Sequence, residues 1–214
     1  ALSLLLHFNF LVMTAEVWHT LLANILNTSI TEFIAVILGL LSVFFIMKQN
    51  ILGYPTGLIN VSIYVWLCFK TGLYANMGIN VFYFIVSIFG WYQWSRKHAG
   101  DEQLRVSRIN KIQLIRVLIS ILVLTLGLWR LLQHFPESSS PFFDAFTTAV
   151  FIVAMVLQAY KKLESWLLWI LGDIIAIPLF AMNGLVFTGF QYLAFLVLAL
   201  SGYLSWKKSL VFND

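Results

Sequence analysis

Two tryptophans and one aspartate recur at helical spacing within the apolar segment SWLLWILGDIIAIPLF, residues 165–180. Trp166, Trp169 and Asp173 stand at positions i, i+3 and i+7, so they share one face of a helix. A carboxylate at the centre of a membrane helix costs about 2.5 to 3.5 kcal/mol on insertion scales, which makes it rare without a role. Indole faces attract cations, and a carboxylate accepts hydrogen bonds from hydroxyl groups. The pattern favours a site for a flat, polar, ring-bearing solute.

The composition places this segment in a membrane. The chain has 214 residues, of which 61% are hydrophobic and 10% charged. Its mean hydropathy is +0.90. Soluble domains have about 45–50% apolar and about 25% charged residues. We therefore predict an all-α integral membrane protein, and the single cysteine, Cys68, excludes an intrachain disulfide.

Apolar runs of helical length predict seven transmembrane helices. Most lysines and arginines follow the first, third, fifth and seventh runs, which predicts a cytoplasmic connector after the third run and a cytoplasmic C-terminus. Residues 1–27 are predicted to form an amphipathic helix on the outer surface, with an eighth span as the alternative. The seven runs cover roughly residues 32–47, 52–69, 73–95, 112–132, 142–160, 165–182 and 185–206.

The two ends of the chain contain an internal repeat. Residues 72–97 align with residues 184–209, so that Gly72 meets Gly184, Gly90 meets Gly202 and Trp94 meets Trp206. Upstream, a one-residue shift pairs Gly53, Thr56 and Asn60 with Trp166, Trp169 and Asp173. Two three-helix repeats joined by a linker helix (3+1+3) are parallel, and such proteins bind substrate where the repeats meet. The predicted units are 1–27 (interfacial helix), 28–97 (first repeat), 98–135 (connector and linker helix) and 136–214 (second repeat and C-terminus).

The candidate substrate site joins aromatic and polar side chains from both repeats. Two simpler interpretations stay open: Trp166 is an anchor at the membrane interface, and Asp173 and Asn60 only hydrogen-bond helices together. Four other aromatic residues, Trp91, Trp94, Tyr203 and Trp206, are predicted to be interface anchors. The candidate site residues are Trp166, Trp169, Asp173, Asn60, Thr56, Asn80, Tyr83, Gln191 and Tyr192.

The motif W-x-x-W-x-x-x-D, with GYPTGLINVSIYVW (53–66) and LYANMGINVFYFIVSIFGWYQW (73–94), resembles the bacterial PnuC family of nicotinamide riboside transporters. The resemblance covers nearly the whole chain from about residue 32. Where this chain has Asn76 and Asn80, the family more often has Asp and Gln. The resemblance implies a fold similar to the SWEET sugar transporters and facilitated diffusion across the inner membrane. It also implies a cytosolic kinase that traps the product without direct contact.

Other function classes lack their residues. The chain has no G-x-x-x-x-G-K-[ST] phosphate loop, and no nucleophile, carboxylate pair or metal-ligand cluster shares a face, so we expect neither an enzyme nor a cofactor or metal. The expected partners are a small molecule and membrane lipid, not nucleic acid, and a homo-oligomer stays open. The alternatives are a transporter of another vitamin such as thiamine, a sugar transporter, and a seven-helix receptor.

Overall fold

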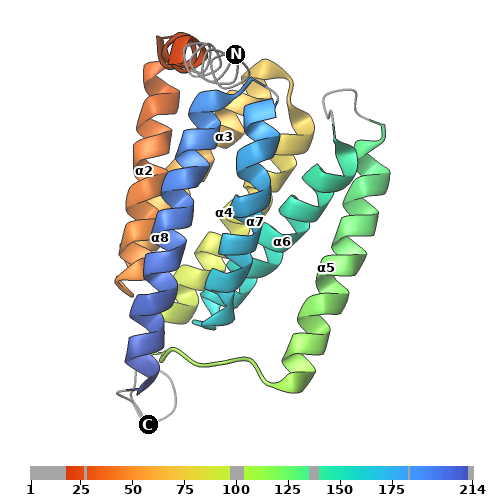
Figure 1. Cartoon of the computed structure of the whole chain (residues 1–214). Coiled ribbons are helices and arrows are strands. Elements are labelled where there is room, and N and C mark those ends of the chain that lie inside the picture. Colours follow the sequence, from red (N-terminus) through yellow and green to blue (C-terminus); the bar gives the residue numbers. More distant parts are fainter. Residues whose placement is uncertain (1–17, 27, 97–103, 135–139, 183, 212–214) are drawn as a thin grey trace, which may run out of the picture.

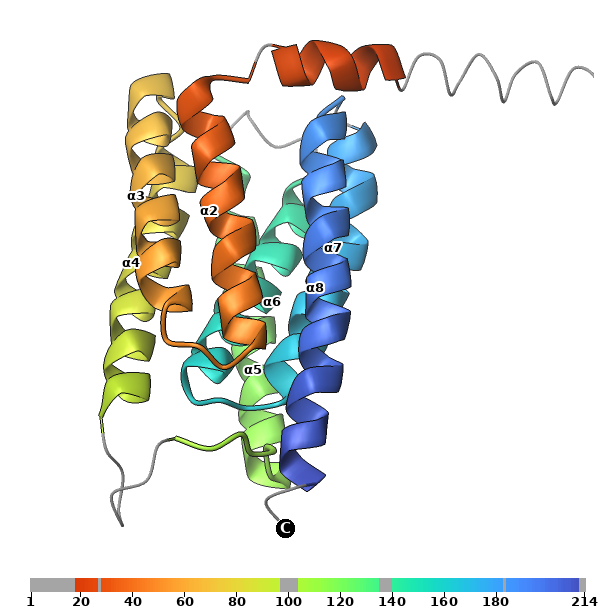
Figure 2. The ribbon, with the colours of Figure 1, turned by 90° about the vertical axis from the view of Figure 1, so that its left-hand side faces the viewer.

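The computed structural model describes residues 18–26, 28–96, 104–134, 140–182 and 184–211. Over these residues the structure is helical, apart from one isolated β-bridge. Residues 18–26 form a short helix that lies across one end of a bundle of seven longer helices (Figures 1 and 2). The seven are α2 (Ile30–Met47), α3 (Gly53–Thr71), α4 (Tyr74–Ser95), α5 (Lys111–Leu132), α6 (Pro141–Ala159), α7 (Glu164–Met182) and α8 (Val186–Val211).

The seven predicted apolar runs are confirmed as helices, with ends that follow local capping chemistry. Ser29 caps α2 by accepting a hydrogen bond from the backbone N–H of Glu32, 3.1 Å away. Asn110 and Gln113 form a reciprocal capping box at the start of α5. Of the interfacial helix predicted over 1–27, only 18–26 belongs to the described part of the chain, and 18–26 is helical.

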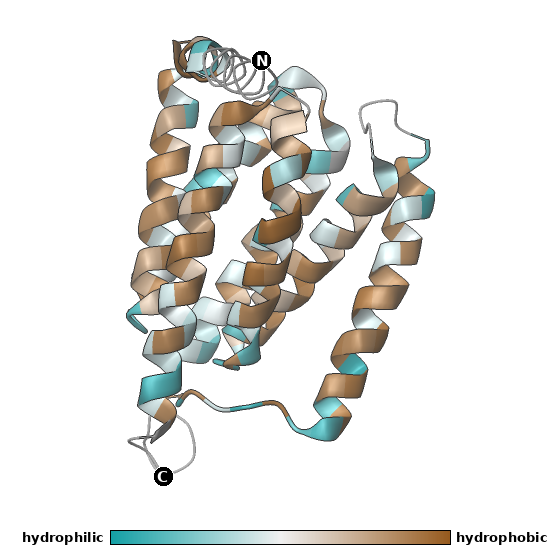
Figure 3. Cartoon of the chain, in the orientation of Figure 1, coloured by the Kyte–Doolittle hydropathy of each residue, from teal (hydrophilic) through white to brown (hydrophobic). Residues whose placement is uncertain are grey.

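The outer surface of the bundle is apolar. Five helices, α2, α5, α6, α7 and α8, are long and hydrophobic enough to cross a membrane. On α5 the leucine, isoleucine and valine side chains are largely exposed, because this helix packs on α6 alone among the extensive helix contacts (Figures 1 and 3). Water does not tolerate so large an apolar surface, but lipid does. The chain is a multi-pass membrane protein.

Helix contacts fall into two matching sets. Within the first triplet α2 packs on α3 and α3 on α4, and within the second α6 packs on α7 and α7 on α8. Between the triplets, α2 packs on α8 and α4 packs on α6. Exchanging the two triplets leaves this set of contacts unchanged, as a twofold relation between them requires.

The backbone turns repeat at one fixed spacing. Four described residues have positive φ, and they form two pairs that are 112 residues apart, from 49 to 161 and from 72 to 184. The hydrogen bond from Asn50 N to Phe45 O recurs from Lys162 N to Leu157 O, with the same spacing. The internal repeat is thus confirmed, but the one-residue shift that sequence alignment introduced upstream of Gly72 is wrong.

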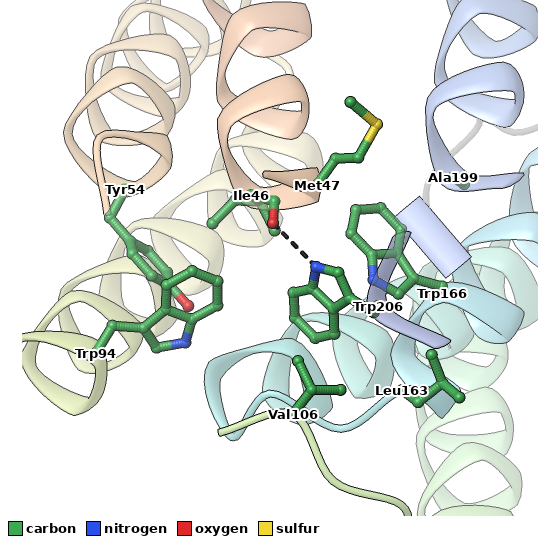
Figure 4. Close-up of a cluster of buried hydrophobic side chains, with 9 residues drawn as sticks. All are labelled: Ile46, Met47, Tyr54, Trp94, Val106, Leu163, Trp166, Ala199 and Trp206. Atoms are coloured by element: carbon green, nitrogen blue, oxygen red, sulfur yellow. Dashed lines mark hydrogen bonds between the residues drawn. The ribbon is translucent and has the colours of Figure 1, made fainter. Parts of the chain in front are cut away.

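With that spacing restored, Trp166 corresponds to Tyr54 rather than to Gly53. Tyr54 packs edge-on against Trp94 with ring centroids 5.1 Å apart, and Trp166 packs likewise against Trp206 at 5.4 Å. Each ring lies against a glycine, because a Cβ on Gly90 or Gly202 would come 2.6 Å from ring carbons of Tyr54 or Trp166. Tyr54, Trp94, Trp166 and Trp206 form an aromatic cluster near the C-terminal end of the bundle (Figure 4).

The prediction of interface anchors is wrong for two of the four residues. Trp94 and Trp206 are 6% and 0% exposed, and Trp206 Nε1 donates a hydrogen bond to Ile46 O at 3.2 Å (Figure 4). The aligned glycines Gly90 and Gly202 let Tyr54 and Trp166 enter the bundle, and Trp94 and Trp206 pack edge-on against those two rings, which a count of apolar residues cannot reveal. Trp91 is exposed on the outer surface.

Beneath the aromatic cluster, residues 104–109 lie along the turn between α6 and α7. Ser107 forms a parallel β-bridge with Lys162, and its backbone N–H donates to Lys161 O at 3.1 Å. Ile109 N donates to a carboxylate oxygen of Glu164 at 3.0 Å. Val106 is buried against the cluster. This segment connects the first triplet to α5 and supports the turn that begins α7.

Candidate substrate cavity

A cavity of about 810 Å³ lies between the two triplets. Its lining includes residues from the first turns of α4 and α6 at one end, such as Asn76 and Asp144. At the other end it reaches Ile46 and Trp166, where the aromatic cluster begins. Cavities of about 300–1,000 Å³ hold most small-molecule ligands, so this one has room for a nucleoside. Eight of the nine candidate residues line it, namely Trp166, Trp169, Asp173, Asn60, Asn80, Tyr83, Gln191 and Tyr192.

Thr56 is the candidate that does not line the cavity. Its hydroxyl donates to Leu52 O at 2.7 Å within α3. Thr56 entered the prediction as the partner of Trp169 in the shifted alignment, whereas the observed repeat pairs Trp169 with Gly57. Gly57 does line the cavity. A shift of one residue turns a helix by about 100°, which moves the side chain to another face.

Asp173 is 2% exposed and lines the cavity from α7. It is near enough to Tyr192 of α8 for an electrostatic interaction. The second acid in the lining is Asp144, and none of the described lining residues is basic. Two carboxyl side chains, with no basic side chain among the described lining residues, favour cationic or neutral solutes over anions.

Asn60 holds two helices together and also lines the cavity. Its Nδ2 donates to Ala35 O at 2.6 Å, which fastens α3 to α2. Gly39 permits this approach, because a Cβ there would lie 3.1 Å from Asn60 Nδ2. The same side chain lines the cavity. Asn60 is thus a helix contact that also contributes to the polar wall.

The two tryptophans of the motif differ in their surroundings. Trp166 is 1% exposed and belongs to the aromatic cluster, where it forms the limit of the cavity. Trp169 stacks on Phe151 with centroids 5.2 Å apart and planes at 26°. Both Nε1 atoms are buried without a hydrogen-bond partner among the described residues. Leaving a buried donor unsatisfied costs about 1–3 kcal/mol, so each indole favours an acceptor in the cavity.

The remaining candidates line the cavity from α4 and α8. Gln191 is hydrogen-bonded to Tyr64, which also lines the cavity. Asn80 Nδ2 donates to Asn76 O at 2.9 Å within α4. Tyr83 lies near Tyr192. Sequence reasoning missed Tyr64 and also Phe151, since neither belongs to a motif and only the packing of the helices brings them to the cavity.

Residues 29–208 match the model of a family described as nicotinamide mononucleotide transporters. The chain belongs to this family.

Curated members of the nicotinamide mononucleotide transporter family include the nicotinamide riboside transporter PnuC of Escherichia coli (strain K12). It is 28% identical over 203 residues, which cover 83% of this chain and 85% of that protein. The PnuC of Neisseria mucosa is 31% identical over 188 residues, covering 82% and 71%. A third relative, the riboflavin/roseoflavin transporter RibM of Streptomyces davaonensis, is 27% identical over 179 residues, covering 82% and 84%.

A solved structure of a family member has the same fold. The crystal structure of the vitamin B3 transporter PnuC superposes with a TM-score of 0.70 at 27% sequence identity. The superposition covers 97% of this chain and 94% of that one. Family membership therefore extends over the cavity and all the helices that line it.

Proposed function

We propose that this protein carries nicotinamide riboside across the cytoplasmic membrane by facilitated diffusion. One observation carries the proposal: the cavity between the triplets combines Trp169 and Asp173 and has no basic residue in its described lining. Nicotinamide riboside pairs a pyridinium cation with a ribose. An indole attracts such a cation by up to about 2 kcal/mol when it is desolvated, and a carboxylate accepts hydrogen bonds from ribose hydroxyls.

The charge of the wall supports the riboside over its phosphorylated form. A phosphate group adds about −1.5 to −2 charges at neutral pH. Binding it beside Asp173 and Asp144 requires a compensating cation, and the described lining has none. The mononucleotide in the family description is therefore the weaker candidate for this chain.

We infer a 3+1+3 arrangement of seven spans, in which α5 is the linker between parallel repeats. Lys161 follows the end of α6 and Lys207 is near the end of α8, and these two helix ends lie at the same end of the bundle (Figure 1). The clustering of cations there supports a cytoplasmic position for that end. The aromatic cluster then closes the cavity toward the cytoplasm, and the helix over 18–26 lies at the outer surface. The remainder of the predicted interfacial unit, 1–17 and 27, lies outside the described residues.

A labelling experiment tests the orientation. A cysteine placed at Arg108, which is exposed beside the α6–α7 turn, is expected to resist an impermeant maleimide applied to intact cells. It should react after the cells are permeabilised, with Cys68 replaced by alanine throughout. Labelling in intact cells would reverse the orientation.

Ligand titration tests the substrate. Purified protein is titrated with nicotinamide riboside, nicotinamide mononucleotide, thiamine and a sugar, and the riboside is expected to bind tightest. In liposomes without an ion gradient, the internal concentration of riboside should rise to the external concentration and stop there. Accumulation beyond it without a trapping enzyme would exclude a facilitator, and in cells a cytosolic kinase would supply the trap. Tighter binding of the mononucleotide would contradict the assignment to riboside.

Riboflavin is the second candidate. Its support is the likeness to the riboflavin/roseoflavin transporter RibM and the number of aromatic rings in the wall. Riboflavin is neutral, so it gains nothing from the two carboxylates as counter-charges. The same titration separates the two vitamins.

A further inference from the structure

Four aromatic rings form a row along the cavity. Trp169 stacks on Phe151 at 5.2 Å, Phe151 on Tyr192 at 6.0 Å, and Tyr192 on Phe180 at 4.9 Å. The planes of successive rings differ by only 24–27°. All four residues line the cavity, and they come from α6, α7 and α8. A flat ligand ring that stacks here joins the row, so its binding depends on the spacing within the row.

Phe151 lies between the rings of Trp169 and Tyr192, two of the candidate residues from the sequence. It is 8% exposed, and its position depends on Gly172 of α7. A Cβ on Gly172 would lie 2.7 and 2.8 Å from Cδ1 and Cζ of Phe151, so the phenyl ring rests directly on the backbone of α7. A ring held this closely has little freedom to retreat from the cavity.

The first triplet has its larger side chain on a different helix. Gly39 of α2 corresponds to Phe151, and Asn60 of α3 corresponds to Gly172, at the spacing that the backbone turns define. There the small residue is on the first helix, and the amide of Asn60 approaches it. Of the two corresponding positions, 39 and 151, only 151 has an aromatic ring, so the space beside Trp169 is limited by the second triplet.

We propose that Phe151 is a specificity-determining residue that limits the cavity to ligands with a single aromatic ring, an inference that rests on the proposed function. Its phenyl group fills the space between Trp169 and Tyr192 that a larger fused ring would need. Removing the group opens that space, while the acids and the indole remain. The residue thus selects among flat heteroaromatic ligands by size, and Asp173 selects by charge and hydrogen bonding.

The first experiment measures a ratio of affinities. Phe151→Ala is titrated with nicotinamide riboside, which has one aromatic ring, and with riboflavin, which has a fused tricycle. We expect the Kd for riboside to rise about two- to tenfold as a stacking partner is lost, and the Kd for riboflavin to fall about tenfold. Phe142→Ala is the matched control, because Phe142 lies on the same helix, is exposed and does not line the cavity.

The second experiment moves the ring instead of removing it. Gly172→Ala should push Phe151 toward the cavity and weaken both ligands, most strongly the tricycle. Adding Phe151→Ala to Gly172→Ala removes the clash, so the double variant should bind riboflavin better than Gly172→Ala alone does. Such a reversal requires direct coupling between the two positions.

An unchanged ratio in folded Phe151→Ala, with a thermal unfolding temperature near that of the control, would overturn the proposal. Should the alanine variant not fold, Phe151→Leu is measured, and the same shift in smaller measure is expected from it; no shift would again overturn it. Failure of the proposed function looks different. In that case the unaltered protein does not bind riboside, whereas the response of riboflavin to the size of residue 151 can still be measured.

Discussion

The two triplets of this transporter share a backbone and differ in what fills it. Both have a left-handed residue between their first and second helices, Gln49 and Lys161, and both rest an aromatic ring on a glycine. At the level of the cavity the side chains of the two triplets differ. Trp169 occupies the position that corresponds to Gly57, and Asp173 occupies the position that corresponds to Val61. The shared backbone leaves a cavity between the triplets, and the unlike side chains give it one aromatic, acidic wall. The similar backbones thus account for the cavity, and the different side chains account for the candidate site within it.

The largest effect is expected where the triplets differ most in charge. Asp173→Ala removes a charge-assisted hydrogen bond worth about 1.5–3 kcal/mol, so riboside affinity should fall about 10- to 150-fold. Val61→Ala, at the corresponding position of the first triplet, should change affinity far less. Titration of the folded fraction is the measurement. A loss of stability with unchanged affinity would mean that Asp173 only holds helices together.

The glycines under the aromatic cluster test the shared part of the comparison. Gly202→Ala drives a methyl group into Trp166, and Gly90→Ala drives one into Tyr54. Overpacking of this kind costs about 1–3 kcal/mol, and equivalent triplets should lose similar amounts. Thermal unfolding in detergent measures it. Gly127→Ala on α5 is the control, since a Cβ there meets nothing within 4 Å. A large loss at only one of the two glycines would break the equivalence.

A smaller effect is expected for Trp169, whose corresponding residue in the first triplet is Gly57. Trp169→Ala should weaken riboside binding by about 0.5–2 kcal/mol, which is about two- to thirtyfold. Trp169→Phe should weaken it less, because a π face remains, and isothermal titration of both variants gives the order. If phenylalanine were as damaging as alanine, the indole N–H rather than the ring face would be the important group.

The smallest effect concerns the turn residues Gln49 and Lys161. Lys161 is 6% exposed, its Nζ lies 4.3 Å from the ring centroid of Trp94, and burial lowers its pKa to about 8. The unfolded chain, with a lysine pKa of about 10.4, then binds more protons between those two values, so stability rises with pH across that window. Lys161→Gln, which copies Gln49, should flatten the rise and stabilise the protein at neutral pH by about 1 kcal/mol. Thermal unfolding of both proteins from pH 7 to 10.5 is the measurement, and parallel curves would contradict it.

Helix positions were predictable because each depends on its own segment. A run of apolar residues such as 112–132 forms a helix whatever its neighbours do, and α5 begins and ends within one residue of that prediction. The spacing of Trp169 and Asp173 on one helical face is equally local, and both line the cavity. The acid inside an apolar segment was the most informative single residue, since the cost of placing it in lipid makes an accidental position rare.

The predictions that were wrong concerned contacts between distant segments. Aligning Asn60 with Asp173 by chemical likeness introduced a shift that the turns at 49 and 161 rule out, and with it came Thr56. Trp94 and Trp206 look like interface anchors along the chain, but only the approach of α4 and α8 buries them together.

The sequence by itself determined an all-helical membrane protein with two similar ends and one acidic, aromatic helix face, because hydropathy and helical period are properties of single segments. Only the tertiary structure decided that Tyr64 and Phe151 join that face and that the aromatic cluster ends the cavity. Phe151 rests on Gly172, and Tyr54 and Trp166 rest on Gly90 and Gly202, so each of these rings depends on a glycine of another helix. Close packing across such pairs is fixed by shape, and shape exists only once the helices have come together.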